Sequence, residues 1–248
     1  MTSRITPLRL ESFERLPKHA RSCVFWELDP DTLGDADHLS DPEFEKEAWL
    51  SMVMLEWGSC GQLAVTARPD RADDESTPCR GFAFYAPPRA VPRAHRFPTG
   101  PVSPDAVLLT SLGVECDDEG DGLPRQLIAA VVADLVRRGV RALEAFGRTA
   151  EVADLGDSCP AELASAIEVF GECAVEQCVI DSDFLLDSGF EVIAPHPYFP
   201  RLRLELEQGL GWKADVEAAL ERLLESTELQ LPVSAVPGAT VSTTTLSD

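Results

Sequence analysis

The stretch that constrains this chain most is residues 106–147, which has the pattern of a strand, a glycine turn, a helix and a second strand. The apolar run AVLLTSLGV (106–114) does not alternate, which indicates a strand covered on both faces. The acidic glycine turn ECDDEGDGLP (115–124) follows, and the apolar run RALEAFG (141–147) ends the stretch. Because backbone N–H groups and the helix dipole attract anions at a helix start, this order predicts a ligand-binding layout.

The segment between the two apolar runs predicts a helix with well-marked ends. Pro124 suits a first turn, Arg138 suits the negative C-terminal end, and Gly139 suits a left-handed stop. A single apolar stripe recurs at the helical period: Leu123, Leu127, Ile128, Val131, Val132, Leu135 and Val136. We therefore expect an α/β domain in which this helix lies on a buried sheet.

The net charge of the chain limits the classes of molecule that it can bind. The 248 residues include 43 Asp+Glu against 21 Lys+Arg, a formal net charge of −22. Such a charge repels nucleic acid and anionic membranes and favours cationic partners, so we expect neither a nucleic-acid nor a membrane partner. A second interpretation, a solvated acidic surface that keeps the protein soluble, stays open.

The cysteines and the N-terminus bear on compartment and metal binding. Seven cysteines are scattered without a C-x-x-C pair, and there are only four histidines. This pattern argues against a disulfide framework and a zinc site, so we predict no metal ligand. MTSRITPLRL lacks the apolar core of a signal peptide, and no run approaches the roughly 18 residues of a membrane-spanning helix. We expect a reduced, cytoplasmic protein.

Further segments predict the rest of a sheet and its helices. Strands are expected at 5–10, 61–67, 81–86, 190–194 and 201–207. Helices are expected at 12–20, from the cap Asp41 to Gly58, and at 177–189. In the second of these helices, Phe44, Ala48, Met52 and Leu55 share a face. The last strand alternates strictly, which is typical of a half-exposed antiparallel strand.

Residues 87–104 contain six prolines and the densest basic patch of the chain: Arg89, Arg93, His95 and Arg96. They cannot form a helix interior or a central strand. One interpretation is an arm that meets phosphate or carboxylate groups near the glycine turn. The other is a solvated loop whose arginines neutralise nearby acids.

The C-terminal part predicts two appendages to a domain spanning 1–207. Residues 208–226 form an amphipathic helix, and 227–248, rich in Ser, Thr and Pro, form a disordered tail. The helix packs either on its own sheet or on a second copy, so the oligomeric state is left open.

The order of these segments over about residues 5–207 resembles that of the GNAT superfamily of acetyl-CoA-dependent N-acyltransferases. Glu119-Gly120-Asp121-Gly122 and the residues up to Leu127 look like its pyrophosphate-loop motif, (Gln/Arg)-x-x-Gly-x-(Gly/Ala). Phe184-Leu-Leu-Asp-Ser-Gly189-Phe190 is similar to the Phe-Tyr-x-x-x-Gly-Phe that closes its fourth helix. The resemblance implies a mixed α/β fold: a mostly antiparallel sheet, flanked by helices and splayed at the central strand.

The resemblance also implies a site. Backbone N–H groups of the turn and helix start would hold the pyrophosphate of acetyl-CoA, and a bulge in the preceding strand would open a notch. The thioester carbonyl would rest on an N–H at the strand end, at Val114 or its neighbour. The implied cofactor-binding residues are Leu112, Val114, Gly120, Gly122, Leu123 and Arg125. Glu115 is the base by position, or else a solvated loop acid.

Two departures bear on this site. Glu119 stands where the family has Arg or Gln, and Asp121 adds a second acid; like charges about 5 Å apart repel by about 3 kcal/mol at an effective dielectric of about 20. Leu185 stands where many members have a tyrosine that protonates the leaving thiolate. A thiolate with a pKa of about 8.5 can leave unaided, and Cys178 or Asp183 could substitute as the acid.

Two functions follow from these observations. The first is an N-acetyltransferase that moves an acetyl group from acetyl-CoA to a primary amine of a small-molecule or protein acceptor, for which the acidic field favours a cationic acceptor. The second is a non-catalytic GNAT-like binding or regulatory module with weak or no CoA binding.

Overall fold

A computed structural model describes residues 3–29, 41–66, 79–115, 122–155 and 175–206. The chain divides into two compact units, Met1–Glu207 and Gln208–Asp248, and the described residues all belong to the first. The expected helix at 208–226 and tail at 227–248 lie outside the described residues. No helix of the described part is long and apolar enough to span a membrane.

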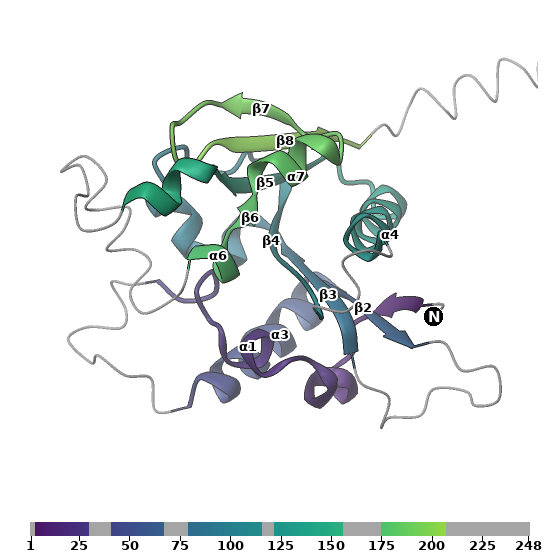
Figure 1. The fold of residues 1–248 in the computed structure, drawn as a ribbon. Helices are drawn as coiled ribbons and strands as arrows, with labels where there is room; N and C mark the ends of the chain where they lie inside the picture. Colours follow the sequence, from purple (N-terminus) through teal and green to yellow (C-terminus); the bar gives the residue numbers. More distant parts are fainter. Residues whose placement is uncertain (1–2, 30–40, 67–78, 116–121, 156–174, 207–248) are drawn as a thin grey trace, which may run out of the picture. The chain divides into compact units, whose positions relative to one another are not determined.

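The described residues form one mixed sheet (Figure 1) in the order β1-β2-β3-β4-β5-β8-β7, with β6 paired to β5 off this path. The strands are β1 (Ser3–Pro7), β2 (Gly61–Thr66), β3 (Cys79–Ala86), β4 (Ala106–Val114), β5 (Ala142–Arg148), β6 (Ile180–Asp181), β7 (Glu191–Ala194) and β8 (Arg201–Glu205). Only β4 with β5 and β5 with β6 are parallel pairs; the other pairs are antiparallel. The expected mostly antiparallel sheet is confirmed.

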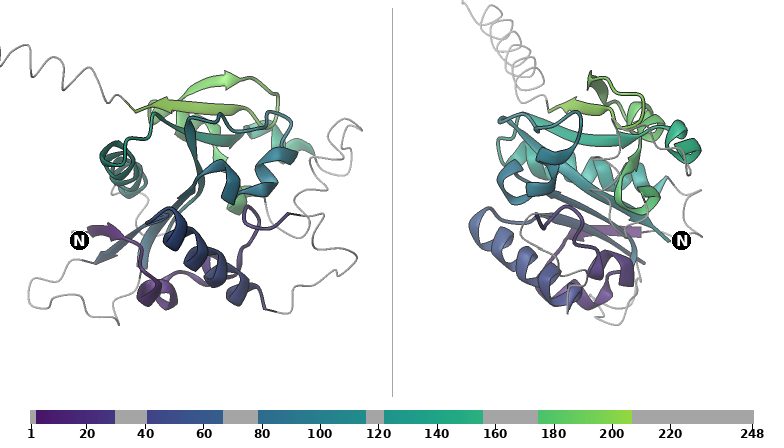
Figure 2. Two further views of the ribbon diagram at one scale, coloured as in Figure 1. Left: turned by 180° about the vertical axis from the view of Figure 1, so that it is seen from behind. Right: turned by 90° about the vertical axis from the view of Figure 1, so that its left-hand side faces the viewer.

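Helices cover both faces of this sheet (Figure 2). They are α1 (Lys18–Ser22), α3 (Pro42–Glu56), α4 (Leu123–Arg137), α6 (Val175–Cys178) and α7 (Ser182–Asp187), with short 3-10 turns η1 (Leu10–Arg15), η2 (Pro88–Ala90), η3 (Pro92–Arg96) and η5 (Ala150–Leu155). Side chains of α1 and α3 pack on one face, and those of α4 and α7 on the other. Strand β3 serves both cores by alternation: Phe82 and Phe84 join the first, and Ala83 and Tyr85 join the second.

The expected bounds of one helix and one strand are wrong. The single helix expected at 177–189 is broken: α6 ends at Cys178, β6 pairs with β5, and α7 begins anew. The break follows from Asp181, whose side chain accepts from the backbone N–H groups of Asp183 and Phe184 and so caps a new helix. The expected strand at 5–10 is shorter, because β1 ends at Pro7.

The buried face of α3 also differs from the expected one. Asp41 caps the helix as predicted, accepting from the Phe44 N–H at 3.0 Å. Phe44 is 62% exposed and Leu55 is 88% exposed. The buried residues of α3 are Lys46, Trp49, Leu50 and Val53. The face predicted from the sequence is therefore not the buried one, and the buried face includes a lysine.

Lys46 is buried because it pairs with Glu27, which lies in the segment after α1. The Lys46 ammonium donates to Glu27 Oε1, and both side chains are almost fully buried. Lys46 Nζ also lies 4.6 Å from the ring centroid of Phe84 on β3. Glu27 Oε2 has no hydrogen-bond partner among the described residues. The pair therefore fastens the segment after α1 to α3 and to the sheet.

This buried pair predicts a strong asymmetry between single and double substitutions. Lys46→Met should lower the free energy of unfolding by about 3–5 kcal/mol, because it leaves the Glu27 carboxylate buried without its cation. Lys46→Met combined with Glu27→Leu should recover most of that loss, because no unpaired charge is then buried. Urea unfolding of the three proteins measures both values.

An exposed ion pair of the same region provides the control. Arg21 pairs with Glu14, whose side chain is 82% exposed, so Glu14→Gln should cost less than about 1 kcal/mol. A Lys46→Met protein as stable as the wild type would contradict the assigned role of the buried pair.

Candidate active site

The site begins where β4 leaves β5. These strands pair only through Ala106–Leu108 and Ala142–Glu144, and beyond that point β4 remains with β3 alone. The β3–β4 register shifts at Thr110, so Leu109 faces Tyr85 while Ser111 faces Phe84. Thr110 is the extra residue of this bulge, and its hydroxyl donates to the Phe84 carbonyl at 3.1 Å. The bulge and splay that the sequence resemblance implied are confirmed.

One edge of β4 therefore directs backbone donors into the notch. The Glu115 N–H donates to the Arg80 carbonyl of β3 at 2.9 Å. Because N–H groups alternate in direction along a strand, those of Leu112 and Val114 point away from β3, toward the gap that β5 has left. These are two of the residues that the sequence argument selected.

The opposite wall of the notch is β6. One edge of strand β5 pairs with the segment that leads into β8. There the Gly147 N–H donates to the Pro200 carbonyl, and the Thr149 N–H donates to the Tyr198 carbonyl. Strand β6 pairs with Gly147 and Arg148 along the other edge, which faces β4. The notch is thus bounded by β4 and by a two-residue strand that sequence reasoning did not find.

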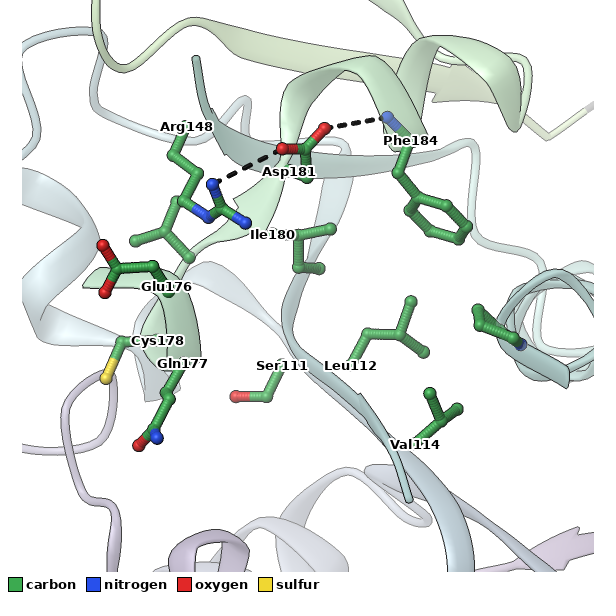
Figure 3. Close-up of a pocket in the computed structure, with 12 residues that line it drawn as sticks. Ser111, Leu112, Val114, Arg148, Glu176, Gln177, Cys178, Ile180, Asp181 and Phe184 are labelled. Carbon is green, nitrogen blue, oxygen red and sulfur yellow. Dashed lines mark hydrogen bonds and ion pairs between the residues drawn. The ribbon is translucent and has the colours of Figure 1, made fainter. Parts of the chain in front are cut away.

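A pocket of about 240 Å³ occupies this notch (Figure 3). Its apolar part comes from Leu112 and Val114 on β4, and from Ile180 and Phe184 on the opposite wall. Pro124, in the first turn of α4, also lines it. The pocket joins the open edge of β4 to the start of α4, and it combines apolar walls with polar side chains, as ligand sites commonly do.

The polar side chains of the pocket come from segments that the sequence argument did not select. Arg148, at the end of β5, lies 3.4 Å from Asp181 and is the one cation among the described lining residues. Its Nε is buried without a hydrogen-bond partner in the described part of the chain. Glu176 lines the pocket from α6 and is exposed. Arg148 can hold an anionic or carbonyl group, and Glu176 can accept a proton.

The start of α4 has the geometry of an open helix end. Gly122 precedes the helix with φ +67°, and among the described residues, its chain neighbours aside, no atom lies within 4 Å of the position that its Cβ would occupy. Leu123 is buried in the core beneath α4, so only its backbone is available to a ligand. Gly120, Glu119 and Asp121 lie outside the described residues.

Two predicted site residues lie apart from the pocket lining. Arg125 donates to the Asp187 carbonyl at 2.7 Å and lies 3.6 Å from its carboxylate, which ties α4 to α7. Glu115 follows β4, is exposed and does not line the pocket. A cofactor contact by Arg125 and a base role for Glu115 remain predictions.

The proline-rich basic segment pairs with acids. Arg89 lies 3.9 Å from Glu56 on α3, and Arg96 lies 3.9 Å from Asp29. Arg93 stacks 4.6 Å from the ring centroid of Phe25. These contacts agree with the interpretation in which the arginines neutralise nearby acids.

The positions considered for protonating the leaving thiolate are Leu185, Cys178 and Asp183. Leu185 is fully buried in the core beside α4, where it packs. Cys178 lines the pocket but is disulfide-bonded, so it has no thiol proton to give. Its bonded partner lies outside the described residues, and the expectation that the cysteines are all reduced is wrong for Cys178. Asp183 is absent from the lining of this pocket.

A group of ligating side chains lies beside the pocket. His19, Cys23 and Cys178 place one ligand atom each within 4.8 Å of one another. Burial lowers the pKa of His19 and raises the pKa of the Cys23 thiol. No sequence motif indicates this group, because Cys23 and Cys178 are 155 positions apart.

Comparison with known proteins finds solved structures of low sequence identity and leaves the activity open. No family model and no curated protein matches the sequence. An N-acetyltransferase from Staphylococcus aureus Mu50 is 13% identical over 84% of this chain and 100% of its own, with a TM-score of 0.42. The PaiA N-acetyltransferase from Thermoplasma acidophilum, in complex with coenzyme A, is 10% identical over 83% and 99%, with a TM-score of 0.44.

A third solved structure is the NatC complex bound to Gag peptide and CoA, 13% identical over 84% of this chain and 100% of that chain, with a TM-score of 0.45. The strand order, the bulge in β4 and its divergence from β5 are the arrangement that the sequence resemblance implied. The fold is therefore similar to the one that the GNAT resemblance implied. Within that fold, the notch between β4 and β6 is the candidate active site.

The two other cysteines of the described residues allow a test of the buried core around this site. Burial raises the pKa of Cys60 to about 12 and that of Cys79 to about 12. At pH 8 only about one thiol in 10,000 is then the reactive thiolate. Neither residue should react with an aromatic disulfide reagent at pH 8 in the folded protein, and the rate should rise about tenfold per pH unit from pH 7 to 9.

Peptide mapping by mass spectrometry after timed labelling measures this protection. The same protein labelled in urea serves as the control, in which both cysteines should be modified fully. Rapid labelling of Cys60 or Cys79 in the folded protein at pH 8 would show that these thiols are not buried as described.

Proposed function

We propose that this protein is an N-acetyltransferase that transfers an acetyl group from acetyl-CoA to a primary amine. The observation that carries the proposal is the open edge of β4, where the N–H groups of Leu112 and Val114 point into an apolar notch. An extended acyl-pantetheine chain, which has its own amide groups, can lie along such an edge as an added strand does.

The residues present fit the reactive end of acetyl-CoA. Ile180 and Phe184 offer an apolar wall opposite β4, and the first turn of α4 offers N–H groups that lack intrahelical acceptors. Pro124 removes one of those donors. When bound, acetyl-CoA supplies an activated thioester whose carbonyl carbon an amine attacks.

Different residues of the chain would then stabilise charge, accept a proton and orient the substrates. The N–H of Val114 or Leu112 donates to the thioester carbonyl oxygen and stabilises the negative charge that develops there during attack. Glu176 accepts the proton of the attacking amine, directly or through water. Arg148, fixed by Asp181, orients a carbonyl or anionic group at the rim. The thiolate leaves unprotonated, because its pKa is about 8.5.

The acceptor that this site favours is a cationic amine, on a small molecule or a protein. The formal charge of −22 raises the local concentration of cations around the molecule. Glu176 adds a carboxylate at the rim of the pocket itself. Both features attract a protonated amine before it loses its proton.

A second function has an observation in its favour. Pro124 removes a donor from the helix start, and the sequence places Glu119 and Asp121 just before it. Carboxylates beside a pyrophosphate oppose its binding. A non-catalytic GNAT-like module with weak or no CoA binding is the alternative that these residues support.

Calorimetric titration with acetyl-CoA separates the two functions. The enzyme should bind with a Kd below about 100 μM, about −5.5 kcal/mol. Gly122→Leu should weaken binding at least about tenfold, because a bulky side chain at φ +67° both strains the turn and fills the open space before α4.

Gly139 provides the matched control, since it has φ +78° at the opposite end of α4. Gly139→Leu should cost similar stability and leave the affinity for acetyl-CoA unchanged. Absence of both binding heat and a thermal shift with acetyl-CoA would reject the enzyme and favour the non-catalytic module.

Two carboxylate variants test the proton acceptor. Glu176→Gln should lower kcat about 100-fold with a panel of primary amines, because the amide cannot accept the proton, and should leave the Kd for acetyl-CoA unchanged. Glu115→Gln should leave kcat unchanged, since Glu115 does not line the pocket. If Glu115→Gln lowers kcat and Glu176→Gln does not, the proton acceptor is Glu115, as expected from the sequence.

A further inference from the structure

Three side chains that ligate soft metals meet beside the pocket, from two distant parts of the chain. His19 lies on α1, Cys23 follows α1 directly, and Cys178 is the last residue of α6. One ligand atom of each lies within 4.8 Å of the other two, and Cys23 Sγ lies 3.8 Å from Cys178 Sγ. No sequence motif indicates that these three side chains meet. They meet because α6 packs against the segment after α1.

The sulfur separation is the one that a tetrahedral zinc ion requires. Zinc–thiolate bonds of about 2.3 Å at the tetrahedral angle place two sulfurs about 3.8 Å apart. The separation of 3.8 Å between the two sulfurs matches this value while Cys178 is still disulfide-bonded, so once that bond is reduced the two sulfurs need little further movement to accept the ion. A histidine nitrogen and two sulfurs form a donor set that zinc prefers over harder cations.

His19 is already oriented as a metal ligand. It precedes Cys23 by four residues, and the Cys23 N–H donates to the His19 carbonyl at 2.8 Å, so the two side chains share one helical face. The imidazole also hydrogen-bonds to the backbone of Gln177, next to Cys178. Such a bond to a ring N–H fixes the tautomer and leaves the other ring nitrogen available to a metal.

We propose that the reduced protein binds one Zn²⁺ through His19, Cys23 and Cys178, at a site that borders the acetyl-transfer pocket and shares Cys178 with its lining. Water or a further donor takes the fourth position. The ion replaces the protons of the two thiols, which leave as H⁺. Because the site joins α1 to α6, it would anchor the wall that carries Glu176.

Reduction is a condition of this site, since Cys178 is disulfide-bonded in the structure. A dithiol reductant supplies two electrons and two protons, cleaves the disulfide into two thiols and is itself oxidised to a disulfide. The Cys178 thiol then becomes available beside Cys23. Zinc binding is therefore expected in the reduced protein and not in the oxidised one.

The proposal is tested on the full-length chain by metal analysis. Protein incubated with ZnCl₂ and a dithiol, then freed of excess metal, should retain about one zinc per chain by mass spectrometry of the metal. His19→Ala and Cys23→Ser should each lower this at least about tenfold. Cys60→Ser should retain the wild-type zinc content, because Cys60 is also a buried thiol but lies outside the group.

Cobalt substitution gives a second readout that needs no variant. Co²⁺ in the reduced wild-type protein should show intense visible bands of a tetrahedral site and thiolate-to-cobalt charge transfer, and oxidised protein should show neither. Weak octahedral bands, zinc content below about 0.1 per chain, or zinc content indifferent to His19→Ala and Cys23→Ser would each overturn the proposal. None of these outcomes depends on acetyl-CoA binding, so they are independent of the proposed function.

Discussion

The structure depends on the early separation of two parallel strands. β4 and β5 are hydrophobic enough to be buried on both faces, yet they pair over only three residues each. Leaving the N–H groups of a buried strand edge without hydrogen-bond partners costs free energy. An edge that faces no other strand therefore needs water or a ligand as its partner. The bulge at Thr110 bends β4 away, and the notch, its apolar lining and the exposed amides of Leu112 and Val114 all follow.

The parts that the sequence could predict are those with a strong local pattern. Strand β4 and helix α4 were predicted almost to the residue, because a continuous apolar run and a single apolar stripe depend on nothing distant. The buried face of α3 was predicted wrongly, because only the distant partner Glu27 allows Lys46 to be buried. Of the predicted site residues, Leu112 and Val114 lie on the predicted strand and line the pocket, and their contact with a cofactor stays a prediction.

The polar part of the pocket escaped prediction for a related reason. Arg148 directly follows the strand predicted at 141–147. Its ion-pair partner, Asp181, is 33 positions further along the chain. Glu176 and Asp181 belong to segments of four and two residues, too short to show any period. The Asp181 cap, recognised as a helix start within 177–189, could have indicated the break.

The cations of this acidic protein are largely used inside the fold. Glu144, fully buried on β5, is paired with Arg201 at 2.9 Å and Arg203 at 3.1 Å, and Asp134 on α4 with Arg137 and Arg138. Buried carboxylates need such partners, because desolvation of an unpaired one is expensive. Among the described residues that line the pocket, Arg148 is the one cation, beside the acids Glu176 and Asp181.

The two-residue strand β6 has a consequence for entry to the pocket. It is registered on β5 through two residue pairs only, between helices of four and six residues that are too short to be stable alone. Segments held by so few hydrogen bonds open by local unfolding at a lower free energy than the whole domain. Local opening of β6 would break only these two residue pairs and leave the seven-stranded path of the sheet intact, so widening the pocket there does not require global unfolding.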